Sequence, residues 1–239
     1  MSNAAQTQRT TVTGQVAERI EAMILDGTLD PGASLPSEVE LARTLAVSRL
    51  TVREATRALA ARGLLHIHQG RRPTVAAPSA ALVGDFFQTS LRRDPEALLD
   101  LLDVRFALEV HAASLAATRA SKTAIAAMRG AIAAMRAAAD DPEAFHDADV
   151  TFHESLAAGT GNQLLSLIIE ALAEPLRASR IQSFEGHLAR GLGVASVIEA
   201  HAAIFDRVEA RDAKGAAKAM RAHLRQTEQD LRTLRLRRR

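Results

Sequence analysis

The segment Val47-Ser48-Arg49-Leu50-Thr51-Val52-Arg53-Glu54-Ala55 decides the fold of the N-terminal part of the chain. Three arginines recur at every fourth position and would share one face of a helix: Arg49, Arg53 and Arg57. Three apolar residues fall on the opposite face and can pack inward: Val52, Ala55 and Leu59. A short helix with an apolar back and an arginine front fits the major groove of DNA, so the segment predicts a DNA-reading helix.

The sequence on both sides of this segment predicts a winged helix-turn-helix. Ser37 and Glu40 match a capping box that begins a helix, and Ser48 can cap the reading helix itself. Alternation of apolar and polar residues then predicts a strand that turns back at Gly70-Arg71-Arg72-Pro73. The predicted elements are helices over about residues 13–26, 37–45 and 48–63, a strand over 64–68 and a returning strand at Thr74-Val75.

The remainder of the chain is predicted to be helical. Residues 10–76 form the winged domain, a linker of small residues covers 77–80, and residues 81–236 form a second domain. Alanine and leucine dominate and aromatic residues make up only 3%, which favours helix over sheet. Seven helices are expected, over about 81–91, 94–119, 121–139, 141–158, 163–184, 194–210 and 212–236. Their short connections predict an antiparallel bundle, so the fold class is mainly α with a small β-hairpin wing.

Composition excludes several classes of function. The chain has no cysteine, so disulfides, thiolate metal sites and thiol catalysis are excluded. It has no apolar run near the roughly 20 residues of a membrane-spanning helix, and its polar first ten residues lack a signal-peptide core. A cytoplasmic protein with no membrane contact is therefore expected. The formal net charge is only +2, but residues 48–75 carry six arginines against the single acid Glu54, which indicates a local surface for phosphate.

The spacing of four residues in the second domain is compatible with a metal site. Asp149 and His153 lie four apart and would share a helix face. His201 lies about ten residues before the turn near Arg211 and His223 about twelve after it, so in antiparallel helices their imidazoles reach a similar height. Such nitrogen-rich ligation suits Zn²⁺, Ni²⁺ or a similar divalent ion, with open positions for water or a ligand. Spacing alone leaves the alternative that these are surface or core histidines.

Other polar residues have simpler interpretations. Five histidines without partners at ligand spacing are expected to be structural or surface residues: His66, His68, His111, His146 and His187. Arg105 and Glu109 lie four apart on a helix, either as a surface ion pair or with the arginine turned inward to hold a carboxylate. Asn162 after Gly161 is most simply a helix cap.

These motifs together resemble the GntR family of bacterial transcription regulators, in its FadR subfamily. The N-terminal resemblance rests on Leu35-Pro36-Ser37-Glu38, Val47-Ser48-Arg49, Thr51-Val52-Arg53-Glu54-Ala55 and Gly63-Leu64. The C-terminal part resembles the helical FCD ligand-sensing domain, through Arg105 with Glu109, Asp149-Val150-Thr151-Phe152-His153, Gly161-Asn162, His201 with Ile204, and His223-Leu224.

The resemblance implies roles for particular residues. The metal ligands of the family are one aspartate and three histidines, and all four positions are filled here, by Asp149, His153, His201 and His223. Arg105 is implied to face an effector pocket, with Asn162 as a second candidate, and the metal would receive the carboxylate of a small organic acid. The candidate DNA contacts are Ser37, Ser48, Arg49, Thr51, Arg53, Arg57, Gln69, Gly70, Arg71 and Arg72. One departure is Val39, where the family commonly has a DNA-contacting arginine.

The expected function is therefore a homodimeric regulator that binds a near-palindromic operator in double-stranded DNA and responds to a small carboxylic acid. One alternative is a constitutive DNA-binding protein with a structural metal. Another is a metal-dependent hydrolase, since such a centre can activate water. Hydrolysis would also need a further acid near the ligands, and none is expected, because Glu154 points about 100° away from His153 around the helix. The protein is therefore not expected to be an enzyme.

Overall fold

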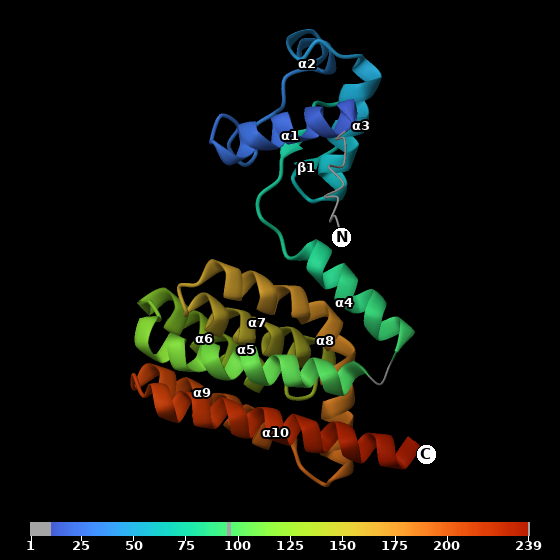
Figure 1. Cartoon of the computed structure of the whole chain (residues 1–239). Coiled ribbons are helices and arrows are strands. Elements are labelled where there is room, and N and C mark those ends of the chain that lie inside the picture. The colour runs from blue at the N-terminus through green and yellow to red at the C-terminus, as the bar shows by residue number, and fades with distance from the viewer. Residues whose placement is uncertain (1–10, 95–96, 239) are drawn as a thin grey trace, which may run out of the picture. The chain divides into compact units, whose positions relative to one another are not determined.

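The computed structural model describes residues 11–94 and 97–238, and the chain divides into two compact units, one ending at Leu82 and the next beginning at Val83 (Figure 1). The helical fold class with a small β-hairpin is confirmed. Pro95, in the predicted first turn of a helix, lies outside the described residues. No helix within the described ranges is both long enough and apolar enough to cross a membrane.

The first unit is built from three helices and a short hairpin. In chain order these are α1 (Val12–Leu25), α2 (Glu38–Thr44), α3 (Arg49–Ala61), β1 (Leu65–His66) and β2 (Thr74–Val75). The predicted capping box at α2 is confirmed, because the Ser37 hydroxyl accepts from the Glu40 amide and the Glu40 carboxylate accepts from the Ser37 amide. The Ser48 hydroxyl caps α3 by accepting from the Thr51 amide at 3.0 Å. The apolar back of α3 is fully buried in the core of this unit.

The hairpin is shorter than the predicted strand over residues 64–68. Leu65 pairs with Val75 and His66 with Thr74, and the ladder stops there. In this register the next partner of Ile67 would be Pro73, which has no backbone N–H to donate. The Pro73 carbonyl instead accepts from the Leu35 amide at 2.9 Å. Proline therefore ends the wing strands early.

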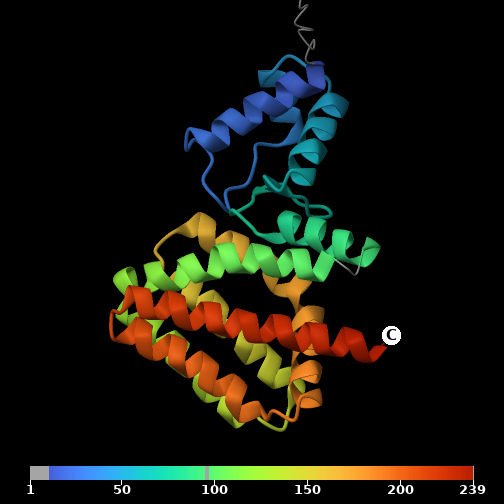
Figure 2. The same cartoon turned by 60° about the horizontal axis from the view of Figure 1, so that its bottom comes forward.

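The second unit is an antiparallel helical bundle. Helix α4 (Ala81–Arg93) contains the boundary between the units, and the bundle continues with α5 (Ala97–Arg119), α6 (Lys122–Ala137), α7 (Pro142–Ala158), α8 (Gln163–Ala189), α9 (Val194–Glu209) and α10 (Ala213–Arg238). Figures 1 and 2 show α9 and α10 side by side. Helix α10 packs against α5, α8 and α9, and α6 packs against α7. Helices α7, α9 and α10 contribute Phe152, Ile204 and Met220 to one buried core, so these helices face a common interior.

Helix α8 runs five residues beyond its predicted end at Phe184 and contains Gly186 in its interior. Here the glycine serves helix packing, because a Cβ atom at Gly186 would overlap the backbone carbonyl of Asp230 in α10. The absence of a side chain at this position lets the backbones of α8 and α10 approach each other closely.

We expect Gly186→Ala to destabilise the protein by about 1–3 kcal/mol or more, because the added methyl group must push the two helices apart. Urea denaturation followed by helical circular dichroism measures the change. Gly130→Ala is the matched control, since Gly130 is an exposed residue inside α6 and a methyl group added there would meet only open space. That substitution should stabilise the helix by about 0.5–1 kcal/mol. Equal effects of the two substitutions would contradict the close crossing.

Candidate metal centre and DNA-facing helix

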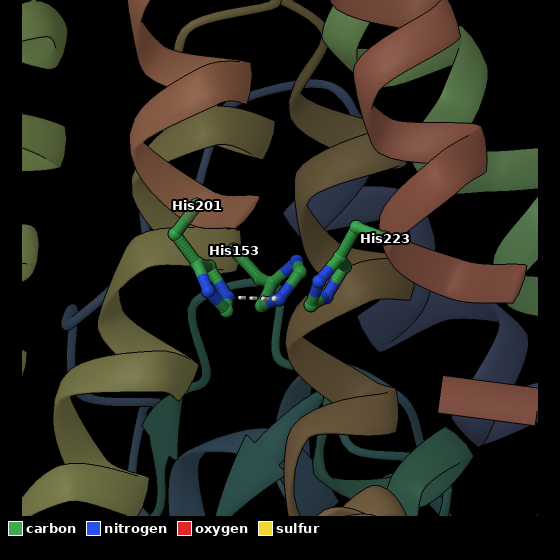
Figure 3. Close-up of side chains that lie close together, drawn as sticks. All are labelled: His153, His201 and His223. Carbon is green, nitrogen blue, oxygen red and sulfur yellow. Dashed lines mark hydrogen bonds between the residues drawn. The ribbon is translucent and has the colours of Figure 1, made fainter. Parts of the chain in front are cut away.

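Three histidines from three helices point at one another inside the bundle (Figure 3). They are His153 on α7, His201 on α9 and His223 on α10, and one nitrogen of each lies within 4.8 Å of the others. His201 is completely buried, while His153 is 1% and His223 9% exposed. Such a group of buried imidazoles could hold a metal ion.

The hydrogen bonds of two imidazoles determine which nitrogen is free. His201 Nδ1 lies 2.8 Å from the Val197 carbonyl oxygen, which can only accept, so Nδ1 carries the hydrogen. His153 Nδ1 lies 2.6 Å from Glu109 Oε2, although this contact is poorly aligned for a hydrogen bond. In the neutral rings both Nε2 atoms then carry lone pairs, yet they lie only 3.4 Å apart. Two lone pairs that face each other need a proton or a cation between them, so the donor set fits a metal ion.

Asp149 joins the same group from the helix turn before His153. Its Oδ1 lies 2.9 Å from His201 Nε2 and 3.9 Å from His153 Nε2. Its side chain is buried, and burial opposes its ionisation, but Arg180 holds the pKa of this carboxyl well below its usual range. The structure thus brings together all four residues that the sequence suggested as ligands, with the aspartate ionised.

Arg105 and Glu109 form a buried pair, so the interpretation as a surface ion pair is wrong. Arg105 Nε lies 2.6 Å from Glu109 Oε1, and both side chains are at most 4% exposed. Burial opposes ionisation of Glu109, but Arg105 and His153 hold its pKa well below its usual range. The expectation that no further acid lies near the ligands is also wrong, because Glu109 contacts His153. Metal-binding histidines commonly place their second nitrogen against such a carboxylate.

Arg180 on α8 is a residue of the site that the sequence did not suggest. Its Nε lies 2.8 Å from Asp149 Oδ2, and its side chain is only 9% exposed. Desolvation by burial lowers its pKa, while the neighbouring Asp149 opposes this effect. No motif marks Arg180 in the sequence, and only the packing of α8 against α7 places it beside Asp149.

A cavity of about 310 Å³ opens beside this cluster. Its walls include Arg105, Asp149, Arg180 and His223, together with apolar residues of α7 and α8 such as Phe145 and Phe184. Asn162 is not among the described residues that line it. The Asn162 side chain instead caps α8 by accepting from the Leu165 amide at 3.2 Å.

The five remaining histidines lie in two kinds of environment. His66, His68 and His111 are exposed, whereas His146 and His187 are buried. His187 has a structural role, since its Nδ1 lies 3.0 Å from Asp230 and its Nε2 lies 2.7 Å from the Ser196 hydroxyl. His146 lines the cavity, and its Nε2 is buried without a hydrogen-bond partner in the described part of the chain.

In the first unit, α3 presents its arginines to solvent. Arg49, Arg53 and Arg57 are all exposed, as the pattern predicted. Arg53 donates two hydrogen bonds to Glu38, at 2.9 and 2.7 Å, and the Arg49 guanidinium lies 3.8 Å from the same carboxylate. The hydrogen bond from Arg53 lowers the pKa of Glu38. Val39, one residue further on, is 56% exposed.

The other candidate DNA contacts surround this helix or lie at the wing tip. Ser37 and Ser48 serve as the helix caps already described, and the Ser48 and Thr51 hydroxyls lie 2.8 Å apart. Four residues form the exposed tip of the wing: Gln69, Gly70, Arg71 and Arg72. Gly70 has a φ of 70°, the left-handed conformation that glycine adopts readily in turns.

Comparison with known proteins gives matches to both units. The FCD domain model matches residues 100–226, and the model of bacterial regulatory proteins, gntR family, matches residues 12–75. The transcriptional regulator LutR of Bacillus subtilis is 33% identical over 211 residues, which cover 86% of this chain and 94% of LutR. The transcriptional repressor NanR of Klebsiella aerogenes is 31% identical over 92% of this chain and 85% of NanR.

Two further matches differ in how much they cover. The Glc operon transcriptional activator of Escherichia coli is 42% identical over 103 residues, but the match spans only 41% of that protein's length and 43% of this chain. The solved structure of a GntR protein from Streptococcus agalactiae superposes with a TM-score of 0.73 at 28% identity. It covers 90% of this chain and 97% of its own. The likeness therefore extends over both units.

The buried imidazoles make stability depend on pH. Burial lowers the pKa of His223 well below its ordinary value, and His201 and His153 lower it further. Burial also lowers the pKa of His153, against the opposing effect of Glu109. The folded state therefore keeps these rings neutral, whereas the unfolded chain protonates them below the ordinary histidine pKa of 6.5. The unfolded state then binds more protons, so acid favours unfolding.

We expect the free energy of unfolding of chelator-treated protein to fall as the pH decreases from about 7.5 to 5.5, by up to about 1.4 kcal/mol per pH unit for each buried neutral histidine. Urea titrations at several pH values measure the slope. His223→Leu should make the slope shallower, and His111→Gln, which changes an exposed side chain, is the control. A slope that His223→Leu leaves unchanged would contradict the assignment of His223 as a buried neutral ring.

Proposed function

Because the chain belongs to the GntR family of bacterial regulatory proteins and carries an FCD domain, we propose that it is a homodimeric transcription regulator whose operator affinity changes when a small organic acid binds beside a metal ion. The matched families and relatives are DNA-binding transcription regulators and not enzymes. Within this proposal residues 10–76 read DNA, residues 81–236 sense the ligand, and residues 77–80 connect them. A protein that binds an operator works in the cytoplasm.

The proposed DNA interface uses the exposed arginine face of α3 and the wing. Arg49, Thr51 and Arg53 reach base edges in the major groove, flanked by Ser37, Ser48 and Arg57 at the backbone. The wing tip, from Gln69 to Arg72, contacts the sugar-phosphate backbone or the minor groove. Each good bidentate contact of an arginine with guanine contributes about 1–3 kcal/mol of discrimination. Two such readers in a dimer would bind half-sites about one helical turn apart.

The observation that carries the sensing proposal is the pair of imidazole Nε2 lone pairs that face each other at 3.4 Å in the bundle. Asp149, His153, His201 and His223 would hold a divalent cation, with Zn²⁺ or Ni²⁺ as the proposed ions. When bound, such an ion supplies positive charge that attracts a carboxylate. The chain's own residues prepare the site, since Glu109 and the Val197 carbonyl orient His153 and His201.

The adjoining cavity supports a sensor rather than a purely structural metal. It reaches the ligand residues Asp149 and His223 and has room for a small acid. A coupling of about 1–3 kcal/mol between this cavity and the DNA-reading units would change operator affinity about 5–150-fold. DNA affinity that no acid changes in metal-loaded protein would favour the alternative of a constitutive DNA-binding protein with a structural metal.

We expect Arg53→Ala to weaken binding to the intergenic DNA upstream of the chain's own gene by about 1–3 kcal/mol, roughly 5–150-fold in a gel-shift titration. The substitution removes a guanidinium from the exposed face of α3. Arg19→Ala removes one exposed arginine from α1 in the same unit and is the matched control. Undiminished binding by the Arg53 variant would remove α3 from the DNA interface.

Metal analysis tests the centre itself. Wild-type protein supplemented with Zn²⁺ or Ni²⁺ and then desalted should retain about one ion per chain, and His201→Ala should retain almost none, because it removes one of the ligand nitrogens. His111→Ala, which truncates an exposed histidine, should retain as much as wild type. Equal and negligible metal in all three proteins would leave only structural histidines.

A further inference from the structure

Two buried side chains beside the metal centre have a nitrogen that no described residue of the chain contacts through a hydrogen bond. Arg180 Nη1 and His146 Nε2 are both inaccessible to solvent and have no partner among the described residues. Both residues line the 310 Å³ cavity, Arg180 from α8 and His146 from α7. Leaving a buried donor unpaired is costly, and a charged donor more so, which indicates that a ligand completes these two.

Arg180 differs in this respect from the other guanidinium of the cavity. Arg105 directs Nε and Nη2 at the two carboxylate oxygens of Glu109, at 2.6 and 3.5 Å. The Glu109 carboxylate therefore neutralises the Arg105 charge. Arg180 contacts Asp149 through Nε, in a poorly aligned contact, and its Nη1 has no partner among the described residues.

Asp149 connects Arg180 to the histidine cluster. One carboxylate oxygen lies 2.9 Å from His201 Nε2 and the other 2.8 Å from Arg180 Nε. When Asp149 is also a ligand of a divalent cation, its single negative charge no longer balances the Arg180 charge. The cavity wall then carries a net positive charge that a carboxylate in this low-dielectric environment can compensate.

His146 supplies a second donor at the same place. It lies three residues before Asp149 on α7, on the same helix face. His146 and Arg180 line the same cavity, and burial followed by the positive charge of Arg180 lowers the pKa of His146, which favours the neutral imidazole. A neutral imidazole can donate from Nε2 to an anion without adding charge.

We propose that Arg180 and His146 form a carboxylate-binding subsite beside the metal centre, and that Arg180 rather than Arg105 is the guanidinium that binds the carboxylate of the organic acid. This inference rests on the proposed function, since the acid and the cation bind in the same cavity. In this arrangement the cation binds near Asp149 Oδ1, which faces His201, and the carboxylate of the acid binds near Arg180, which contacts Asp149 Oδ2.

The test uses full-length protein loaded with Co²⁺, whose visible absorption reports changes in its coordination. Acetate, L-lactate and citrate are titrated separately into wild type and variants. Arg180→Gln should raise the half-saturating concentration of each acid that wild type binds by at least about tenfold, while the Co²⁺ content stays the same. Arg177→Gln removes an arginine one turn earlier on α8, with a 38% exposed side chain outside this cavity, and should leave the titration unchanged.

Two further variants protect the test against misfolding. Arg180→Lys keeps the positive charge beside Asp149 but loses the second donor of the guanidinium, so it should fold and still weaken acid binding. His146→Leu should weaken acid binding less than Arg180→Gln, because it removes a neutral donor. Circular dichroism confirms that each variant is folded.

The outcomes separate this inference from the proposed function. If Arg180→Gln and Arg180→Lys bind the acids as tightly as wild type, or if Co²⁺-loaded wild type responds to none of the three acids, the subsite is wrong while the metal centre stands. If wild-type protein binds no Co²⁺, both the metal centre and the subsite are wrong.

Discussion

The candidate metal centre of the second unit depends on buried imidazoles that meet inside a helical bundle. The Nδ1 atom of each ring has its own partner, Glu109 for His153 and the Val197 carbonyl for His201. These contacts turn the two Nε2 atoms toward each other. These contacts join α5, α7 and α9, and His223 adds α10. The polar cluster therefore lies where these four helices meet. A cation bound there would contact side chains of several helices at once.

Local sequence signals predicted much of this molecule. Caps, helix periodicity and the arginine face of α3 depend on residues a few positions apart, and the structure confirms the caps at α2 and α3. The spacing of the four candidate ligands was compatible with a metal site, since two share a helix face and two lie at matched distances from a turn, and the family resemblance singled them out. In each case the geometry follows from the rise and period of a helix.

The remaining features depend on contacts between segments far apart in the chain. Arg180 belongs to the site only because α8 packs beside Asp149, and no spacing rule connects residues on those two helices. Gly186 allows a close approach of the α10 backbone, and nothing in the local sequence indicates that contact. The pair Arg105–Glu109 was visible as an i, i+4 pattern, whereas its burial against His153 was not.

The contact between Glu38 and Arg53 has a consequence for how the first unit searches a genome. Glu38 occupies the same edge of the guanidinium that a guanine would use, so it is an internal competitor for Arg53. If Arg53 reads DNA as proposed, it could keep its hydrogen bonds to Glu38 on non-specific sequence, while other basic side chains contact the phosphates. A base pair that presents two acceptors, such as guanine in the major groove, would then replace Glu38 as the partner of Arg53, and this exchange would add to sequence selectivity.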